Sequence, residues 1–250
     1  MLAGIKRSFS GLLAQIGRLS ATGANIANAT TPGYKRTEGT FSEILLSGLD
    51  RGSVPVAPGA EGMNLARGVE FRSEMLFTQG GLVATGRPLD IAIEGQSWIE
   101  LVDEGGRVSF TREGSFTQDA MGRLVHGSGA WIPGIIIPPD ATIIDVDHSG
   151  RISVAQDGGV AEVGQLRLVS FANPSGLLAL GQSTFSVGEN SGAGEADTEA
   201  RVHQGYLELS TVSLSDEMTS LIRAQRAYQA GSQAVRTLDE MWENVNALRR

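Results

Sequence analysis

Residues 2–33, LAGIKRSFSGLLAQIGRLSATGANIANATTPG, decide how the N-terminal end of the chain folds. Apolar side chains recur there at spacings of three and four, with Gly23 at the one missing step: Leu2, Ile5, Phe9, Leu12, Ile16, Leu19 and Ile26. This spacing predicts an amphipathic helix of about 27 residues. Pro32 and Gly33 end the helix, because the residue before a proline avoids helical dihedral angles and glycine permits a turn.

The C-terminal end repeats the pattern, with Gln225 and Ser232 in the gaps of an apolar stripe: Leu214, Met218, Leu221, Tyr228, Val235, Leu238, Met241, Val245 and Leu248. Ser213 and Asp216 stand at the spacing of a capping box, so we expect the helix to begin at Leu214. On periodicity alone, such a stripe more often packs on its own domain than against another subunit. The two helices can pair with each other or with neighbouring subunits.

The middle of the chain has a period of two. Gly106-Arg107, Gly122-Arg123 and Gly150-Arg151 share one local pattern, and alternating runs follow the first and third. A glycine followed by alternation is typical of β-hairpins. We therefore expect strands in this region, including 89–93, 135–137, 143–146 and 165–171. The breaker-rich stretch before it, with Pro55 and Pro58, predicts an extended connector.

The predicted fold is α+β. It has a discontinuous α-helical coiled-coil domain, formed by residues 1–36 and 210–250, and a central mainly β domain over residues 71–209. Residues 37–70 connect the first helix to the β domain.

Composition excludes several classes of function. The formal net charge of −8 argues against a nucleic-acid partner, which needs a basic face. The chain has no cysteine, which excludes disulfides and thiol chemistry. No segment is apolar enough to span a bilayer, and polar residues interrupt the stretch after Lys6 and Arg7, so we expect no cleaved signal peptide.

No catalytic, cofactor-binding or metal-binding motif is complete. Residues 145–150, DVDHSG, match the first half of a calcium loop, but Gln156 stands where a bidentate glutamate is needed. The alternative, a hairpin turn between two strands, is favoured. We therefore expect no catalytic residue, no cofactor and no metal, and a protein that is not an enzyme.

Residues 25–28, NIAN, and 31–34, TPGY, lie in the stretch ATGANIANATTPGYKR at 21–36. They resemble the N-terminal signature of flagellar rod and hook proteins. Residues 205–241 are similar to the C-terminal helix of that family, and residues 85–95, TGRPLDIAIEG, to the motif that opens its β domain. Thr30, where the family usually has asparagine, is a mild departure, as are Thr211 and Ser213.

The subtype most resembled is the distal rod protein. This resemblance rests on residues 77–80 (FTQG), 164–168 (GQLRL) and 171–177 (FANPSGL). A proximal rod protein of similar size is the alternative within the family. A free-standing β-domain module for cell-wall glycan is the alternative from another class, although Trp98, Trp131 and Trp242 are scattered along the sequence.

The resemblance implies a structural subunit that polymerises into a helical tubular drive shaft and transmits torque to the hook. Its terminal helices would form an inner coiled-coil layer. The implied assembly interface comprises Ile5, Phe9, Leu12, Ile16, Leu19, Asn25, Ile26, Asn28, Pro32, Gly33, Tyr34, Met218, Leu221, Gln225, Tyr228, Val235 and Leu238. The implied partners are further copies of the chain, other rod and hook proteins, the P-ring and L-ring bushing and the flagellar export apparatus. The implied location is the periplasmic rod of the basal body.

Overall fold

The computed structural model describes residues 2–46, 66–139, 141, 143–156 and 159–247. The chain divides into two compact units. The helical unit contains residues 1–26, 37–74 and 213–250, and the β unit contains residues 27–36 and 75–212. The chain therefore enters the β unit briefly at 27–36, returns to the helical unit, and then builds most of the β unit.

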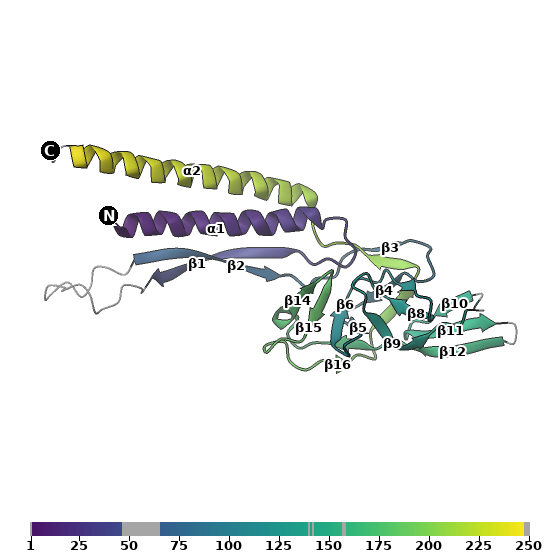
Figure 1. Ribbon diagram of the computed structural model, residues 1–250. Helices are drawn as coiled ribbons and strands as arrows, with labels where there is room; N and C mark the ends of the chain where they lie inside the picture. Colours follow the sequence, from purple (N-terminus) through teal and green to yellow (C-terminus); the bar gives the residue numbers. More distant parts are fainter. Residues whose placement is uncertain (1, 47–65, 140, 142, 157–158, 248–250) are drawn as a thin grey trace. The chain divides into compact units, whose positions relative to one another are not determined.

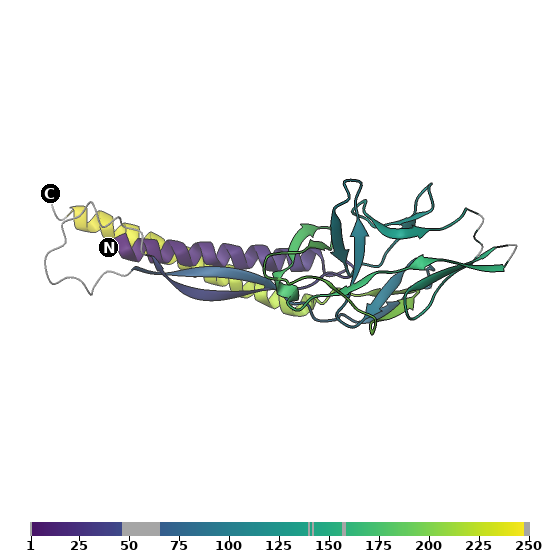
Figure 2. The ribbon, with the colours of Figure 1, turned by 90° about the horizontal axis from the view of Figure 1, so that it is seen from below.

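Two long helices, α1 (Leu2–Ala27) and α2 (Leu214–Ala247), dominate the helical unit. α2 begins at Leu214 as predicted, and the backbone N–H of Glu217 donates to the carbonyl of Ser213 as the first helical bond. Figures 1 and 2 show the helices side by side and antiparallel. They approach closely at Gly231, where an added Cβ would lie 3.0 Å from Cδ2 of Leu12.

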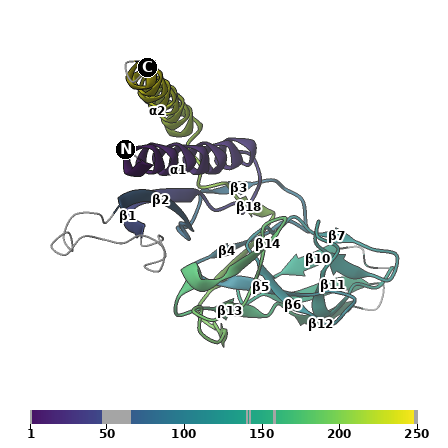
Figure 3. The same cartoon turned by 60° about the vertical axis from the view of Figure 1, so that its left-hand side comes forward.

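Strands β1 (Thr37–Leu46) and β2 (Ala66–Met75) pair into a two-stranded ribbon beside α1 (Figures 1 and 3). They occupy the two ends of the segment that the sequence indicates as an extended connector. Phe41 and Phe71, whose ring centroids are 5.5 Å apart in an edge-to-face contact, hold the ribbon together. The prolines of the connector lie in residues 47–65, outside the described residues.

The β unit contains short antiparallel strands, as predicted for this region: β3 (Leu82–Ala84), β4 (Ile91–Glu94), β5 (Trp98–Val102), β6 (Val108–Thr111), β7 (Thr117–Gln118), β8 (Arg123–Val125), β9 (Trp131–Ile136), β10 (Ile143–Val146), β11 (Arg151–Gln156), β12 (Gly159–Gln165), β13 (Leu168–Ser170), β14 (Leu178–Gly181), β15 (Thr184–Ser186), β16 (Glu195–Ala196), β17 (Arg201–Gln204) and β18 (Tyr206–Glu208). A single 3-10 turn, η1 (Pro174–Gly176), interrupts them. The α+β class is confirmed.

The main sheet runs in the order β14-β15-β6-β5-β9-β8-β7, and β13 pairs with β5 and β16. A separate sheet has the order β10-β11-β12, and β17 and β18 pair with β4 and β3. The inward side chains of these sheets form one large apolar core, which includes Ile99, Leu124 and Ile152, and a second aromatic core around Trp98. These two cores hold the β unit rigid enough to position the segment at 27–36.

The three glycine–arginine sites are turns, and the turns at 106–107 and 150–151 close hairpins as predicted. Each turn also uses an aspartate three residues before its glycine: Asp103, Asp119 and Asp147. In each case a carboxylate oxygen accepts from the backbone N–H of the arginine, and the glycine has a positive φ. The segment 145–150 is thus a hairpin turn whose carboxylate at 147 is engaged by its own backbone.

Candidate assembly interface

The apolar stripe of α1 is covered only in part by the contacts that α1 makes within the chain: Leu12, Leu19 and Ile26 are half-buried, and Phe9 and Ile16 are exposed. Phe9 is 59% exposed and Ile16 is 47% exposed, and Leu13 lies on the same face. The buried face of α1 carries small and polar residues instead, such as Ala14 and Thr22. The chain therefore leaves uncovered two of the side chains that its sequence pattern predicts to be buried, Phe9 and Ile16.

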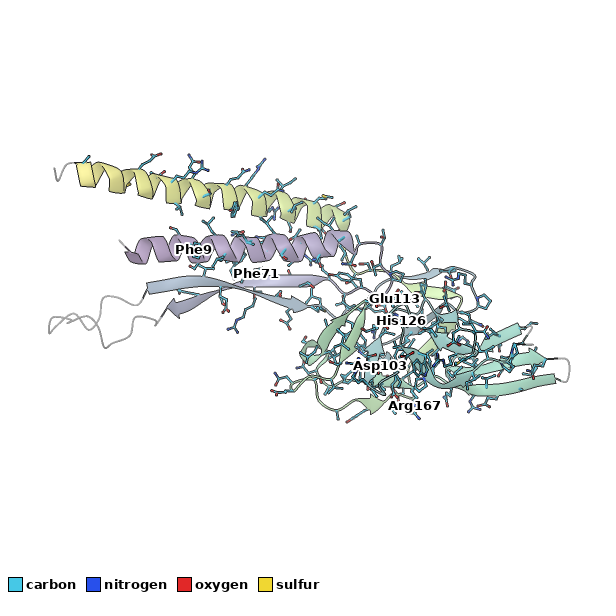
Figure 4. All side chains as sticks on the ribbon, in the orientation of Figure 1. Phe9, Phe71, Asp103, Glu113, His126 and Arg167 are labelled. Carbon is cyan, nitrogen blue, oxygen red and sulfur yellow. The ribbon has the colours of Figure 1, made fainter. Side chains whose placement is uncertain are left out.

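Glycine at position 17 explains how the ribbon approaches α1. An added Cβ at Gly17 would lie 2.7 Å from Cδ1 of Phe71, and one at Gly39 would lie 1.9 Å from the tip of the same ring. Figure 4 shows Phe71 between β2 and α1. The hydroxyl of Ser10 also accepts from the backbone N–H of Val69. The ribbon thus covers the small-residue face of α1 and leaves Phe9 and Ile16 exposed.

Helix α2 also leaves apolar side chains exposed. Leu214, Met218 and Ile222 follow one another at a spacing of four residues, and all three are exposed. Among the side chains of this helix that the structure describes, Glu217 and Ala224 are buried. An exposed row of this kind is typical of a helix that packs against another molecule.

The predicted interface residues fall into groups by exposure. The exposed ones are Phe9, Ile16, Met218, Gln225 and Tyr228. The half-buried ones are Leu12, Leu19, Ile26, Asn28, Pro32, Tyr34, Leu221 and Val235. Asn25 and Gly33 are buried. The side chains of Ile5 and Leu238 lie outside the described residues.

Asn25 ends α1 by bonding the backbone that follows. Its side-chain nitrogen donates to the carbonyl of Thr37 at 2.8 Å, and its side-chain oxygen accepts from the N–H of Thr37 at 2.9 Å. A buried side-chain amide that bonds both the N–H and the C=O of one residue fixes the direction in which β1 starts. Asn25 therefore holds the helical unit together and is not itself an exposed contact.

Glycine is required at position 33 of the signature. Gly33 has a φ of +67°, and an added Cβ would lie 2.7–2.9 Å from the backbone of Arg112 and Glu113. Its N–H donates to the carbonyl of Glu208, and the N–H of Thr211 donates to the carbonyl of Tyr34. The segment that enters the β unit is thus paired with the segment that leaves it.

A buried ion cluster joins the same two segments inside the β unit. Nζ of Lys35 lies 2.6 Å from Oε1 of Glu208, and Nη1 of Arg112 lies 3.2 Å from Oε2 of that carboxylate. Lys35 also donates to the carbonyl of Thr78, and Arg112 to that of Gly95. Burial lowers the pKa of Lys35 and Arg112, and the Glu208 carboxylate opposes that shift.

The sequence pattern gave a weak signal for this cluster. Lys35 follows the Thr-Pro-Gly-Tyr signature, and Glu208 stands between two leucines in a short strand. A charged residue between apolar strand residues indicates a buried partner. Nothing in the sequence alone identifies Lys35 and Arg112 as the partners of that carboxylate.

The aromatic surface that a glycan-binding module needs is not formed by the tryptophans that the structure describes. Trp98 is buried in the second core. The guanidinium of Arg123 lies 4.2 Å from the ring centroid of Trp131.

Among the described residues there is also no group of three side chains that could hold a metal ion. The helices searched include none with the length and apolarity of a membrane span.

Three family models match the chain in order. The model described as "Flagella basal body rod protein" matches residues 8–35. The "Flagellar hook protein FlgE/F/G D1 domain" model matches residues 92–154. The "Flagellar basal body rod FlgEFG protein C-terminal" model matches residues 203–248. The first and third models cover the two segments that pair through Gly33 and Glu208.

Curated relatives match over nearly the whole length. The flagellar basal-body rod protein FlgG of Agrobacterium fabrum is 38% identical, over 93% of this chain and 94% of the relative. The protein of the same name from Caulobacter vibrioides is 34% identical, over 98% of both. That from Bacillus subtilis is 31% identical, over 100% of both. The chain therefore belongs to the flagellar basal-body rod protein family, as a structural subunit and not an enzyme.

Proposed function

We propose that this chain is a distal-rod subunit that polymerises into a helical tube and transmits torque to the hook. The observation that carries this proposal is the exposure of the apolar stripe of α1, with Phe9 and Ile16 uncovered. Leaving such side chains in water costs about 1.5–3 kcal/mol each relative to burying them. A neighbouring subunit that covers the stripe recovers this free energy at every contact of a polymer.

In the proposed tube, the helices of successive subunits pack into an inner coiled-coil layer, and the β units form an outer layer. The interface residues are those predicted from the sequence, with the exposed members Phe9, Ile16, Met218 and Tyr228 at its centre. The segment at 37–70 lies between subunits and stiffens the tube. Torque needs many simultaneous contacts per subunit, and two helices and a ribbon supply them.

The partners proposed for this subunit are further copies of itself and the other rod and hook proteins. Where a P-ring and an L-ring are present, they surround the rod as a bushing. The flagellar export apparatus delivers the subunit unfolded, without a cleaved signal peptide, and the assembled rod crosses the periplasm.

A charge placed in the stripe tests the proposal. Ile16→Asp and Leu221→Asp are each expected to abolish rod assembly, because burial of a carboxylate costs several kcal/mol. The measurements are swimming in soft agar, rods counted in purified basal bodies, and circular dichroism of the purified variants. Normal swimming by both variants would overturn the proposal.

Two control variants separate assembly from folding. Ile16→Val keeps the stripe apolar, so rods should form in normal numbers. Val160→Asp places the same charge at a residue that is 78% exposed on β12 in the β unit, so it should leave assembly intact. If Val160→Asp blocks assembly as strongly as Ile16→Asp, the stripe is not the decisive surface.

A further inference from the structure

Charge is divided unequally between the two units. The residues of the β unit include 17 Asp and Glu and 9 Lys and Arg, which gives a formal net charge of −8. The residues of the helical unit include 11 of each, which gives a net charge of zero. Within α2, residues 218–238 hold three arginines and no acidic residue. The helical surface is thus locally cationic in a chain that is acidic overall.

The β unit has a pocket of about 550 Å³ beside the N-terminal signature. Asn28, Tyr34 and other residues of the signature line one side, and the β14–β15 hairpin lines another. Met75 and Phe185 give the pocket an apolar wall. A volume of this size accommodates a long side chain with its neighbours.

Glu113 and His126 are polar residues that line the pocket, and Figure 4 shows them beside each other. Nδ1 of His126 accepts from the N–H of Ser128 at 3.1 Å, so a neutral ring carries its proton on Nε2. That buried Nε2 lies 3.4 Å from Oε2 of Glu113, without the geometry of a hydrogen bond. The carboxylate of Glu113, which accepts from the Ser115 hydroxyl at 3.0 Å, has further lone pairs that can accept from an incoming donor.

Glu113 is ionised, and the one group beside it that can carry a positive charge, among the described residues, is His126, which does so only when it is protonated. Burial raises its pKa, but the adjacent His126 ring and the hydroxyls of Ser115 and Ser183 outweigh burial and hold the pKa of Glu113 below its ordinary value. Within the described part of the chain no lysine or arginine pairs with Glu113. The ammonium group of Lys35, which lines the same pocket, donates to Glu208 and Thr78 instead.

We propose that this pocket receives the guanidinium of Arg226 from α2 of a second copy of the chain, an inference that rests on the proposed polymerisation. A guanidinium offers planar N–H donors to Glu113, and its aliphatic stem suits the wall made by Met75 and Phe185. Arg226 is exposed and makes no ion pair with a described residue. It lies one turn after the exposed Ile222, so the apolar row of α2 continues into it.

A contact of this kind between copies can build a filament. The pocket lies on the β unit and Arg226 lies on the helical unit, so the contact joins different surfaces of two copies. Such a heterologous contact repeats from copy to copy and builds a filament when the rotation does not close a ring. The acidic charge of the β unit also attracts the cationic stretch of α2 before contact.

Charge exchange tests the pairing. Glu113→Arg and Arg226→Glu are each expected to lower the number of rods per cell at least about tenfold, because each places two like charges at the contact between neighbours. The double variant carries both opposite charges and restores the pair between neighbours, so rods should return. Arg236→Glu changes an exposed arginine ten residues further along α2, about 15 Å away at ~1.5 Å per residue, and should have little effect.

Cross-linking tests the contact in chains that keep both charged residues. Because the chain has no cysteine, each introduced cysteine is unique. Chains with Gln182→Cys in the pocket and differently tagged chains with Gln229→Cys, one turn after Arg226, are co-expressed and treated with a short bismaleimide. We expect a product with both tags in assembled rods, and none when Thr237→Cys replaces Gln229→Cys.

The outcomes separate this inference from the proposed function. If rods form but the 182–229 product is absent, the pocket contact is wrong and the rod function stands. If the double variant is folded by circular dichroism but builds no rods, the pairing is also wrong. If the unmodified chain does not enter rods at all, the proposed function itself fails.

Discussion

Nζ of Lys35 and Oε1 of Glu208 lie 2.6 Å apart, although 173 residues separate them in sequence. Both side chains are buried, and Arg112 bonds the second oxygen of the same carboxylate. Two cations therefore share one anion, and the carboxylate also accepts from the N–H of Gly80. The stability of the β unit should depend on this carboxylate more than on any exposed ion pair.

Removing the charge of Glu208 should destabilise the β unit strongly. We expect Glu208→Gln to lower the free energy of unfolding by about 3–5 kcal/mol, because it leaves two buried cations without an anion. Chemical denaturation of the purified chain measures this change. Glu189→Gln, at an exposed position, is the matched control and should change stability by less than about 0.5 kcal/mol. Equal effects of the two substitutions would contradict the central role of Glu208.

Two glycines of α1 should respond in opposite directions to alanine. Gly17→Ala drives a Cβ into the ring of Phe71 and should cost about 1–3 kcal/mol. Gly23→Ala meets no atom within 4 Å and should gain up to about 1 kcal/mol from helix propensity. Helix content by circular dichroism during thermal unfolding separates the two. A stabilising Gly17→Ala would show that β2 does not pack on α1 at this point.

The aspartate turns should make stability fall in acid. The backbone N–H of Arg107 is the largest influence lowering the pKa of Asp103, and the hydroxyl of Ser149 is the largest for Asp147. A depressed folded-state pKa gives stability that is present above the unfolded value of about 3.9 and lost as pH falls through the folded value. The variant Asp103→Asn/Asp147→Asn should therefore lose less melting temperature than the unmodified chain between pH 6 and pH 2.

The exposed Glu189 supplies the comparison for that measurement. Glu189→Gln removes a carboxylate outside the three turns. Its melting temperature should fall in acid as much as that of the unmodified chain. If the double turn variant and Glu189→Gln have the same pH profile, the turn carboxylates do not set the acid stability.

The helices of a free subunit should be cut by protease before the β unit is. Their apolar stripes are exposed in a single chain, and isolated helices are marginal in water. Limited proteolysis of the purified monomer should leave a resistant product near residues 75–212. The peptide around 33–36 should stay bound to it, since it pairs with 208–211 and buries Lys35. Equal resistance of α1 and the β unit would argue against folding coupled to assembly.

Local patterns in the sequence predict the helices well, because a stripe with a period near 3.6 and a proline–glycine stop are local signals. α1 ends at Ala27 and α2 begins at Leu214, as these signals indicate. The hairpin at 150–151 was also predictable, since glycine at a turn and alternation after it are adjacent in sequence. Family resemblance added the role of the chain, which periodicity alone leaves open.

Contacts between distant residues could not be predicted in the same way. The ribbon of β1 and β2 depends on Phe41 meeting Phe71 across a segment rich in turn residues. The buried residues Lys35, Arg112 and Glu208 are far apart in sequence, and no rule of sequence spacing connects them. The exposure of Phe9 was likewise unpredictable, because a stripe looks the same whether its own chain or a neighbour covers it.

Because Lys35 bonds Glu208, the β unit can fold fully only when the chain extends at least to residue 208. Lys35 is made early in synthesis and Glu208 late, so an interrupted chain lacks the anion that makes burial of the lysine favourable. We expect a chain truncated after Gln204 to leave the β unit open and sensitive to protease, even though it retains most of both cores. An incomplete chain would then fail to form its β unit and could not join a growing polymer.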